Sequence, residues 1–215
     1  MMGRCDVRFG CWLCLLGLVL PKSALAGALP ARPGPDHGSN FYLLAGVEGL
    51  DFDLDPRGVQ EFVDAGLDPR VDEGGPVLGV GWVFRRPLRL DLTIGAWSAV
   101  VDRPEVECNV VRAAADLHLS IAESERVALE GTFSVGAVAV VYRGLPDEEA
   151  FIGTSAGVGL TGRLALFGRV GLGVGYQYQL GRFQPTTFEL DDDEVIRVQP
   201  TARMQAVRVA VYLDL

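Results

Sequence analysis

The sequence contains little cysteine and little histidine. It has four cysteines in 215 residues, three of them among the first 14, and two histidines. Cys108 is the only cysteine in the remaining chain, which excludes an intramolecular disulfide there. The formal net charge is −9 at pH 7. Because nucleic-acid binding needs clustered cations that neutralise phosphates, this acidic composition argues against a nucleic-acid partner.

Long apolar runs are confined to the N-terminus. Arg4 and Arg8 precede an apolar run over residues 9–20, and residues 24–26 read ALA. Twelve apolar residues suit the core of a secretory signal peptide and are too few to span a bilayer as a helix. We therefore predict a signal peptide over residues 1–26, removed by cleavage near Ala26.

A short leader is expected to follow the signal peptide. Residues 27–39 are rich in Pro and Gly, which predicts a flexible periplasmic leader. Cleavage removes three basic residues and one acidic residue, so the formal net charge changes from −9 to −11. No later segment contains 18 consecutive apolar residues, so no transmembrane helix is expected.

From Asn40 to Leu215 the chain alternates apolar and non-apolar side chains. A period of two indicates β-strands, and eight such segments follow one another. In the fourth segment, the apolar residues are Val111, Ala113, Ala115, Leu117, Leu119 and Ile121, which alternate with a set that includes Arg112, Asp116, His118 and Ser120. The pattern predicts one all-β domain over residues 40–215.

One stretch of this domain matches a nucleotide-binding pattern. Residues 157–162 read GVGLTG, which fits the G-x-G-x-x-G fingerprint of dinucleotide-binding proteins. That fingerprint requires a helix that begins at the glycines, whereas the alternation continues here on both sides. We interpret the stretch as a strand with Gly157 and Gly159 on its non-apolar face.

Two features favour a membrane barrel over a soluble barrel with an apolar interior. Glycine dominates the non-apolar face of the sixth and seventh segments, which suits a narrow barrel interior better than a water-exposed surface. Short and long links also alternate, as in outer-membrane barrels with short periplasmic turns and longer extracellular loops. The short links lie at residues 86–87, 122–125 and 162–165, and the long ones at residues 53–75, 102–107, 144–150 and 181–199.

The whole pattern resembles the small eight-stranded outer-membrane barrels of the OmpA/OmpX type. The resemblance covers residues 40–215 and includes the strand-like C-terminus VRVAVYLDL over residues 207–215. It implies an eight-stranded antiparallel up-and-down transmembrane β-barrel in the outer membrane of a Gram-negative bacterium. It also implies a monomer in contact with outer-membrane lipid and lipopolysaccharide, whose C-terminal strand is recognised by the barrel-assembly machinery.

The non-apolar faces carry charges that should point into the lumen. Because buried charges are normally paired, we expect salt bridges that fill the lumen. A gated ion path, as proposed for lumens of the OmpA type, is the alternative. The predicted lumen charge network consists of Glu48, Arg89, Asp91, Arg112, Asp116, His118, Glu130, Arg163, Arg169 and Arg208.

Three residues of the fourth and fifth segments raise an enzymatic alternative. His118, Ser120 and Glu130 resemble the His-Ser-Glu set of outer-membrane lipid A deacylases, in which histidine activates serine and the acid orients histidine. Their side chains are expected to point inward, near the periplasmic end, away from the lipid substrate of that enzyme. The asparagine expected after the serine is replaced by Ile121.

The register between the fourth and fifth segments is also predicted. Directly opposed residues share a face, so their numbers must sum to an even value. A five-residue loop, residues 122–126, would place His118 opposite Glu130, and a three-residue loop would oppose two acids. A histidine beside a carboxylate gains a charge-assisted hydrogen bond, so we expect the five-residue loop. Arg112 or Arg163 should then neutralise Asp116.

The predicted loops contain acidic clusters and one helical pattern. Residues 147–149 and 191–194 are acidic but lack EF-hand spacing, so solvated loops are expected, with no metal site and no cofactor. Residues 58–67 have the apolar spacing of a short helix. Together, these observations predict a non-enzymatic barrel with an envelope-structural or surface-interaction role. A small gated pore is the second hypothesis, and a lipid A-modifying hydrolase is the third.

Overall fold

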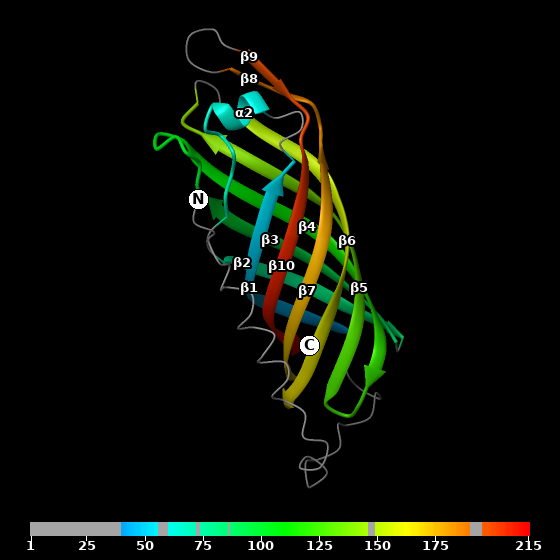
Figure 1. Cartoon of the computed structure of the whole chain (residues 1–215). Helices are drawn as coiled ribbons and strands as arrows, with labels where there is room; N and C mark the ends of the chain where they lie inside the picture. Colours follow the sequence, from blue (N-terminus) through cyan, green and yellow to red (C-terminus); the bar gives the residue numbers. More distant parts are fainter. Residues whose placement is uncertain (1–39, 56–59, 72–73, 86, 146–148, 190–194) are drawn as a thin grey trace, which may run out of the picture. The chain divides into compact units, whose positions relative to one another are not determined.

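The computed structural model describes residues 40–215 except residues 56–59, 72–73, 86, 146–148 and 190–194. The predicted signal peptide and leader therefore lie outside the described residues. Eight long strands form the domain (Figure 1). They are β1 (Phe41–Leu54), β2 (Gly75–Arg85), β3 (Leu88–Ala99), β4 (Glu107–Glu123), β5 (Val127–Arg143), β6 (Glu149–Phe167), β7 (Val170–Phe183) and β10 (Thr201–Asp214).

These strands close into a barrel in the order β1-β10-β7-β6-β5-β4-β3-β2. Every pair of neighbours is antiparallel, and the first and last strands pair along Tyr42–Leu54 and Ala202–Asp214. Closure leaves no unpaired edge, which is the only way for a sheet to lie in lipid with its backbone polar groups satisfied. The predicted all-β, eight-stranded antiparallel up-and-down barrel is confirmed.

The strands are strongly tilted. Following paired residues once around the barrel from Arg203 returns to β10 at Leu213, ten residues further along the strand. A stagger of this size in an eight-stranded barrel corresponds to a tilt of about 40° from the barrel axis. Two residues along a strand therefore rise about 5 Å along the axis.

Short turns and long loops lie at opposite ends of the barrel, which we call the turn end and the loop end. The loop end carries helix α2 (Gln60–Asp64) and a separate hairpin of β8 (Thr186–Glu189) and β9 (Val195–Val198) (Figure 1). Helix α2 lies within the predicted helical stretch. The β8–β9 hairpin was not predicted.

The turn between β6 and β7 was misplaced by the sequence pattern. The link between β6 and β7 was expected at residues 162–165, but Gly162 pairs with Val174 and the ladder continues to Phe167. The turn is formed by Gly168 and Arg169 instead, and Gly168 has the positive φ of 53° that glycine tolerates best. The prediction was wrong because alternation alone does not show where a strand ends.

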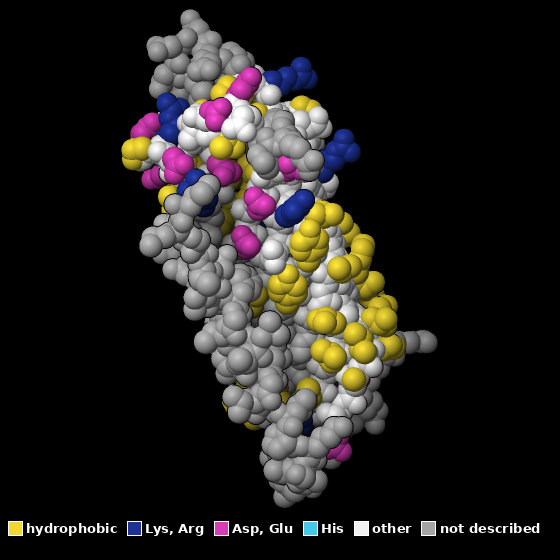
Figure 2. Space-filling view, in the orientation of Figure 1, with side chains coloured by type: hydrophobic (Ala, Val, Ile, Leu, Met, Phe, Trp, Pro, Cys, Tyr) yellow, Lys and Arg dark blue, Asp and Glu magenta, His cyan; other side chains and the backbone are white. Residues whose placement is uncertain are grey.

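Apolar side chains cover the outside of the barrel, as predicted. Figure 2 shows them gathered on the barrel wall, away from the charged side chains of the loop end. The exposed apolar belt includes Leu43, Val47, Leu78, Val80, Leu92, Ile94, Leu119, Phe133, Val135, Val158, Leu160, Val174, Val209 and Val211. Aromatic rings also lie on this surface: Phe41 stacks on Trp82 with centroids 5.4 Å apart.

The part of the chain that the structure describes contains no helix with the length and apolarity needed to cross a membrane.

The GVGLTG stretch lies inside β6 and is not a phosphate loop. A Cβ on Gly157 or Gly159 would collide with the backbone oxygen of Tyr178 or Tyr176 on β7. These glycines therefore allow the neighbouring strand and its glutamine side chains to fill the lumen closely. A Cβ on Gly162 would meet no atom closer than 3.9 Å.

We predict that Gly157→Ala and Gly159→Ala each lower the free energy of unfolding by about 1–3 kcal/mol, because overpacking forces the backbone to shift. Gly162→Ala is the matched control, with an expected effect within about 0.5 kcal/mol. Urea unfolding of the barrel in lipid vesicles measures both. An equal loss of unfolding free energy at all three positions would contradict the conclusion that Gly157 and Gly159 allow β7 to pack closely.

Candidate functional site

The candidate site is the charged lumen. The structure places nine of the ten predicted network residues inside the barrel, where eight are buried and the Arg163 side chain is 20% exposed. Arg169 is the exception, because it is exposed in the β6–β7 turn. Its assignment to the lumen was wrong for the same reason as the misplaced turn: strand β6 is longer than the pattern indicated.

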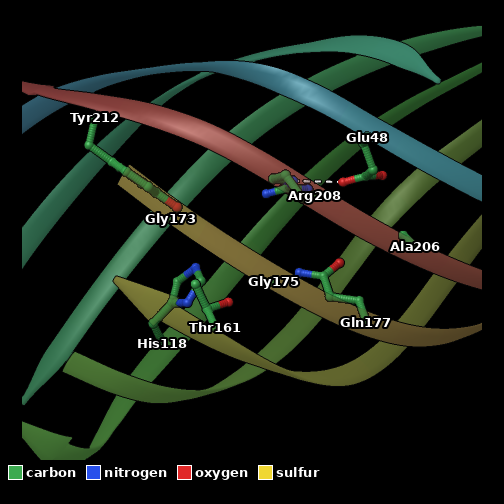
Figure 3. Close-up of a pocket in the computed structure, with 9 residues that line it drawn as sticks. All are labelled: Glu48, His118, Thr161, Gly173, Gly175, Gln177, Ala206, Arg208 and Tyr212. Atoms are coloured by element: carbon green, nitrogen blue, oxygen red, sulfur yellow. Dashed lines mark hydrogen bonds and ion pairs between the residues drawn. The ribbon is translucent and has the colours of Figure 1, made fainter. Parts of the chain in front are cut away.

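The first cluster, which we call the Glu48 cluster, consists of Glu48, Arg112, Asp116 and Arg208. Glu48 on β1 and Arg208 on β10 are directly opposed in the sheet, and Arg208 Nε donates to Glu48 Oε2 at 2.6 Å (Figure 3). Arg112, from β4, approaches the other oxygen of Glu48 at 2.7 Å. Arg208 also donates to Asp116 at 3.1 Å. The Glu48 carboxylate thus links β4 to β10, which are not neighbours in the barrel.

The partner of Asp116 differs from the expected one. Arg112 or Arg163 was predicted to neutralise this carboxylate, but Arg208 makes the ion pair. Arg208 projects from β10, which is not adjacent to β4 in the barrel. A contact across the lumen depends on barrel diameter and tilt, and a sequence pattern does not contain this information.

The second cluster, which we call the His118 cluster, consists of Arg89, Asp91, His118, Glu130 and Arg163. Arg89 pairs with Glu130 at 2.8 Å and with Asp91 at 3.5 Å. His118 lies between the two acids, with Nε2 3.2 Å from Asp91 and Nδ1 3.6 Å from Glu130. Arg163 reaches Glu130 at 4.0 Å. All five residues therefore belong to one connected set.

Two tyrosines enclose the arginines of the His118 cluster. Tyr42 donates its hydroxyl hydrogen to Asp91. The Arg89 guanidinium lies 5.5 Å from the Tyr42 ring centroid and 5.3 Å from that of Tyr212, and Arg163 lies 4.3 Å from the latter. Such cation–π contacts stabilise a partly desolvated arginine. Sequence analysis did not identify this role of the two tyrosines.

The two clusters balance in charge. They contain four carboxylates and four arginines, so the formal charges of these eight side chains cancel. Removing an ion from water costs several kcal/mol, and this cost is offset only when each charge has close partners. The ion pairs above provide them. The arrangement can fix the strands relative to one another and block the lumen.

The register of β4 and β5 corrects the predicted loop. His118 lies opposite Thr132, and Glu130 lies opposite Ser120, so the prediction of a directly opposed His118–Glu130 pair was wrong. A register shift at Ile121 leaves a three-residue turn, residues 124–126, in place of the expected five-residue loop. His118 and Glu130 still meet diagonally across neighbouring strands, as the 3.6 Å separation shows.

An aromatic cap closes the loop end of the lumen. Phe62 of α2 is fully buried, and its ring centroid lies 5.6 Å from that of Tyr142 and 5.2 Å from that of Phe151. The Tyr142 hydroxyl donates to the carbonyl oxygen of Leu67 in the same loop. Burial also raises the pKa of the neighbouring loop carboxyl, Asp68. Sequence analysis predicted the helix but not its place over the barrel mouth.

A small void lies between the two clusters. A void of ≈ 10 Å³ lies among Glu48, His118, Thr161, Gln177, Arg208 and other residues (Figure 3). This volume holds about one water molecule. Among the described residues, no three or more His, Cys, Asp or Glu side chains are grouped so as to bind a metal ion. The acidic residues 147, 148 and 191–194 lie outside the described residues.

Comparisons with known proteins identify the fold. No protein-family model matches the chain, and no curated protein matches its sequence. Neisserial surface protein A (NspA) matches in structure with a TM-score of 0.59 and 13% identity, over 84% of this chain and 100% of that chain. Ail, the attachment invasion locus protein of Yersinia pestis, has a TM-score of 0.48 and 12% identity, over 81% and 97%.

At 13% sequence identity, the match to NspA is evidence about the fold alone. NspA is covered completely, so the similarity extends over a whole barrel. The closed order of eight antiparallel strands and the outward apolar belt agree with it. The chain therefore has the fold of the small eight-stranded outer-membrane β-barrels.

Proposed function

We propose that the protein is a non-enzymatic barrel of the Gram-negative outer membrane with an envelope-structural or surface-interaction role. The observation that carries this proposal is the filled lumen. The aromatic cap covers its loop end, and the Glu48 and His118 clusters fill its charged part. A barrel of this kind acts through its outer surface and its loops.

The proposal assigns an orientation and a route to the membrane. After cleavage near Ala26, the turn end faces the periplasm and the loop end faces outward, as the short-turn, long-loop pattern of such barrels indicates. The C-terminal strand β10 closes the barrel by pairing with β1 and β7. It is the segment that the assembly machinery would recognise, and the mature protein would be a monomer.

The geometry around His118 favours a structural role over hydrolysis. Its Nδ1 atom lies 3.1 Å from Thr132 Oγ1, and its Nε2 atom faces Asp91. A hydrolase of the lipid A deacylase kind needs histidine hydrogen-bonded to an accessible serine. His118 is 2% exposed, and the barrel wall separates it from lipid.

We therefore expect neither His118→Ala nor Ser120→Ala to change the acyl pattern of lipid A in cells that express the protein.

Single-channel recording in planar bilayers tests the closed lumen. We expect the wild-type protein to give no steady ion current, because the ion pairs and the aromatic cap leave no continuous path. Phe62→Ala should leave the current at background, since the charged clusters remain, and Glu61→Ala on the exposed face of α2 is its control. A steady, defined conductance of the wild type would instead favour the gated pore.

A further inference from the structure

We propose that the outer surface of β6, β7 and β10 contains a binding site for the phosphate groups of an outer-leaflet lipid. This inference rests on the proposed place of the barrel in the outer membrane. The site consists of four outward side chains just above the apolar belt, which we call the donor row. They are Thr154, Arg182, Thr201 and Arg203.

The sheet register brings these side chains together. Arg182 on β7 is directly opposed by Thr154 on β6 and by Thr201 on β10. Arg203 stands two residues from Thr201 on the same face of β10. Neighbouring side chains on one face of a sheet lie about 5–8 Å apart, so one phosphate can reach both guanidinium groups and a hydroxyl. Arginine is well suited to this because its fork of N–H donors matches phosphate oxygens.

The height of the donor row matches the phosphate level of a bilayer. Leu180 is the last outward apolar residue of β7 and is 56% exposed. Arg182 follows two residues later, which is about 5 Å further along the barrel axis. Headgroups occupy about 5–8 Å on each side of the hydrocarbon core. Figure 2 shows basic side chains along the upper border of the apolar surface.

All four side chains are exposed, and none makes a side-chain hydrogen bond or ion pair within the described part of the chain. They differ in this from Arg70, an exposed loop arginine that pairs with Asp102 at 3.2 Å. They differ also from the Tyr176 hydroxyl below the row, which donates to Gln205 at 2.9 Å. The row therefore offers donors without protein acceptors at a level where lipid supplies acceptors.

One carboxylate marks the edge of the site. Asp53 on β1 is directly opposed to Arg203, on the side away from Arg182. A phosphate bound directly by the arginines would be repelled by this carboxylate, whereas a phosphate bridged by a divalent cation would be attracted to it through the cation. The geometry of β6, β7 and β10 favours direct binding, because their part of the row contains two arginines and two hydroxyls and no carboxylate.

The test measures lipid binding by native mass spectrometry on the chain purified from outer membranes and freed of lipid. The probe is diphosphoryl lipid A, and its dephosphorylated form and inorganic phosphate are compared with it. A basic residue at a membrane surface contributes about fivefold in affinity, so Arg182→Gln with Arg203→Gln should weaken binding about 30-fold. Arg70→Gln with Arg169→Gln removes the same charge elsewhere and should leave the affinity unchanged.

Further arms separate the alternatives. Asp53→Asn should leave binding unchanged or strengthen it, and chelation of divalent cations should have no effect. Equal binding of dephosphorylated lipid, equal loss in both double variants, or displacement by inorganic phosphate would each overturn the proposal. Heat-modifiable migration on gels confirms that every variant is folded. If the arginine variant does not fold, Thr154→Val with Thr201→Val provides a second test, with a smaller loss expected.

Failure of this proposal is distinguishable from failure of the proposed function. If the donor-row substitutions do not change the lipid affinity, this proposal fails, but the proposal of a closed barrel in the outer membrane is unaffected. A conducting wild type would reject the closed lumen without altering lipid affinity.

Discussion

Replacing Glu48 by glutamine is expected to lower the free energy of unfolding by about 3–5 kcal/mol, the cost of breaking a buried ion pair. Glu48 is fully buried and is the shared partner of Arg112 and Arg208. Its neutralisation leaves the two arginine charges of the Glu48 cluster with a single carboxylate, Asp116, which pairs with Arg208. Unfolding in urea, followed in lipid vesicles by tryptophan fluorescence, measures the loss.

Glu105→Gln is the matched control for this change. Glu105 pairs with Arg103 at 3.2 Å, but its side chain is 57% exposed. Exposed ion pairs contribute about 0–1 kcal/mol, so the control should change stability little. Adding Arg208→Gln to Glu48→Gln should recover part of the loss, because one uncompensated charge is removed. Equal effects of Glu48→Gln and Glu105→Gln would contradict a structural lumen network.

Replacing Val158 by arginine is expected to destabilise the barrel in lipid by about 2–4 kcal/mol, the cost of a cation at the bilayer midplane. Val158 is 59% exposed on β6 and lies midway between the outward residues Ile152 and Leu164. Its paired neighbours Phe133 and Tyr178 are also exposed and carry no charge, so neither provides a carboxylate that would neutralise an arginine there.

The control for this substitution is Ser98→Arg. Ser98 is exposed near the loop end of β3, where an arginine reaches the interface and should cost about 0–1 kcal/mol. The same unfolding titration in vesicles compares the two variants. A tolerated arginine at residue 158 would mean that this face of β6 is not in contact with lipid.

The sequence contains most of the information about the barrel wall. Alternation over residues 111–121 predicts both the existence of β4 and the face that each side chain occupies, because a strand has a strict period of two. The same parity identified the inward charges of β1, β3, β4, β5 and β10. Gly157 and Gly159 were assigned to a strand because no helix follows them.

Features that depend on distances across the barrel were not predictable in this way. Sliding β5 along β4 by two residues keeps every side chain on the same face of the sheet. The alternation therefore does not choose between Thr132 and Glu130 as the residue opposite His118. The register shift at Ile121 decides it. The Arg208–Asp116 pair and the burial of Phe62 require the closed barrel, because the partners come from strands or loops that are not adjacent in sequence.

The central claim is that apolar side chains face lipid while charged side chains face a filled lumen. Spin labels on single cysteines, in a Cys108→Ser background, test it most directly. Labels at Phe133→Cys and Val135→Cys on β5 should collide with oxygen dissolved in lipid and not with a water-soluble nickel complex. Ser134→Cys, whose parent side chain is buried in the lumen, should react with thiol reagents only after unfolding. Accessibility of residues 133 and 135 to the nickel complex, with residue 134 in contact with lipid, would contradict the account.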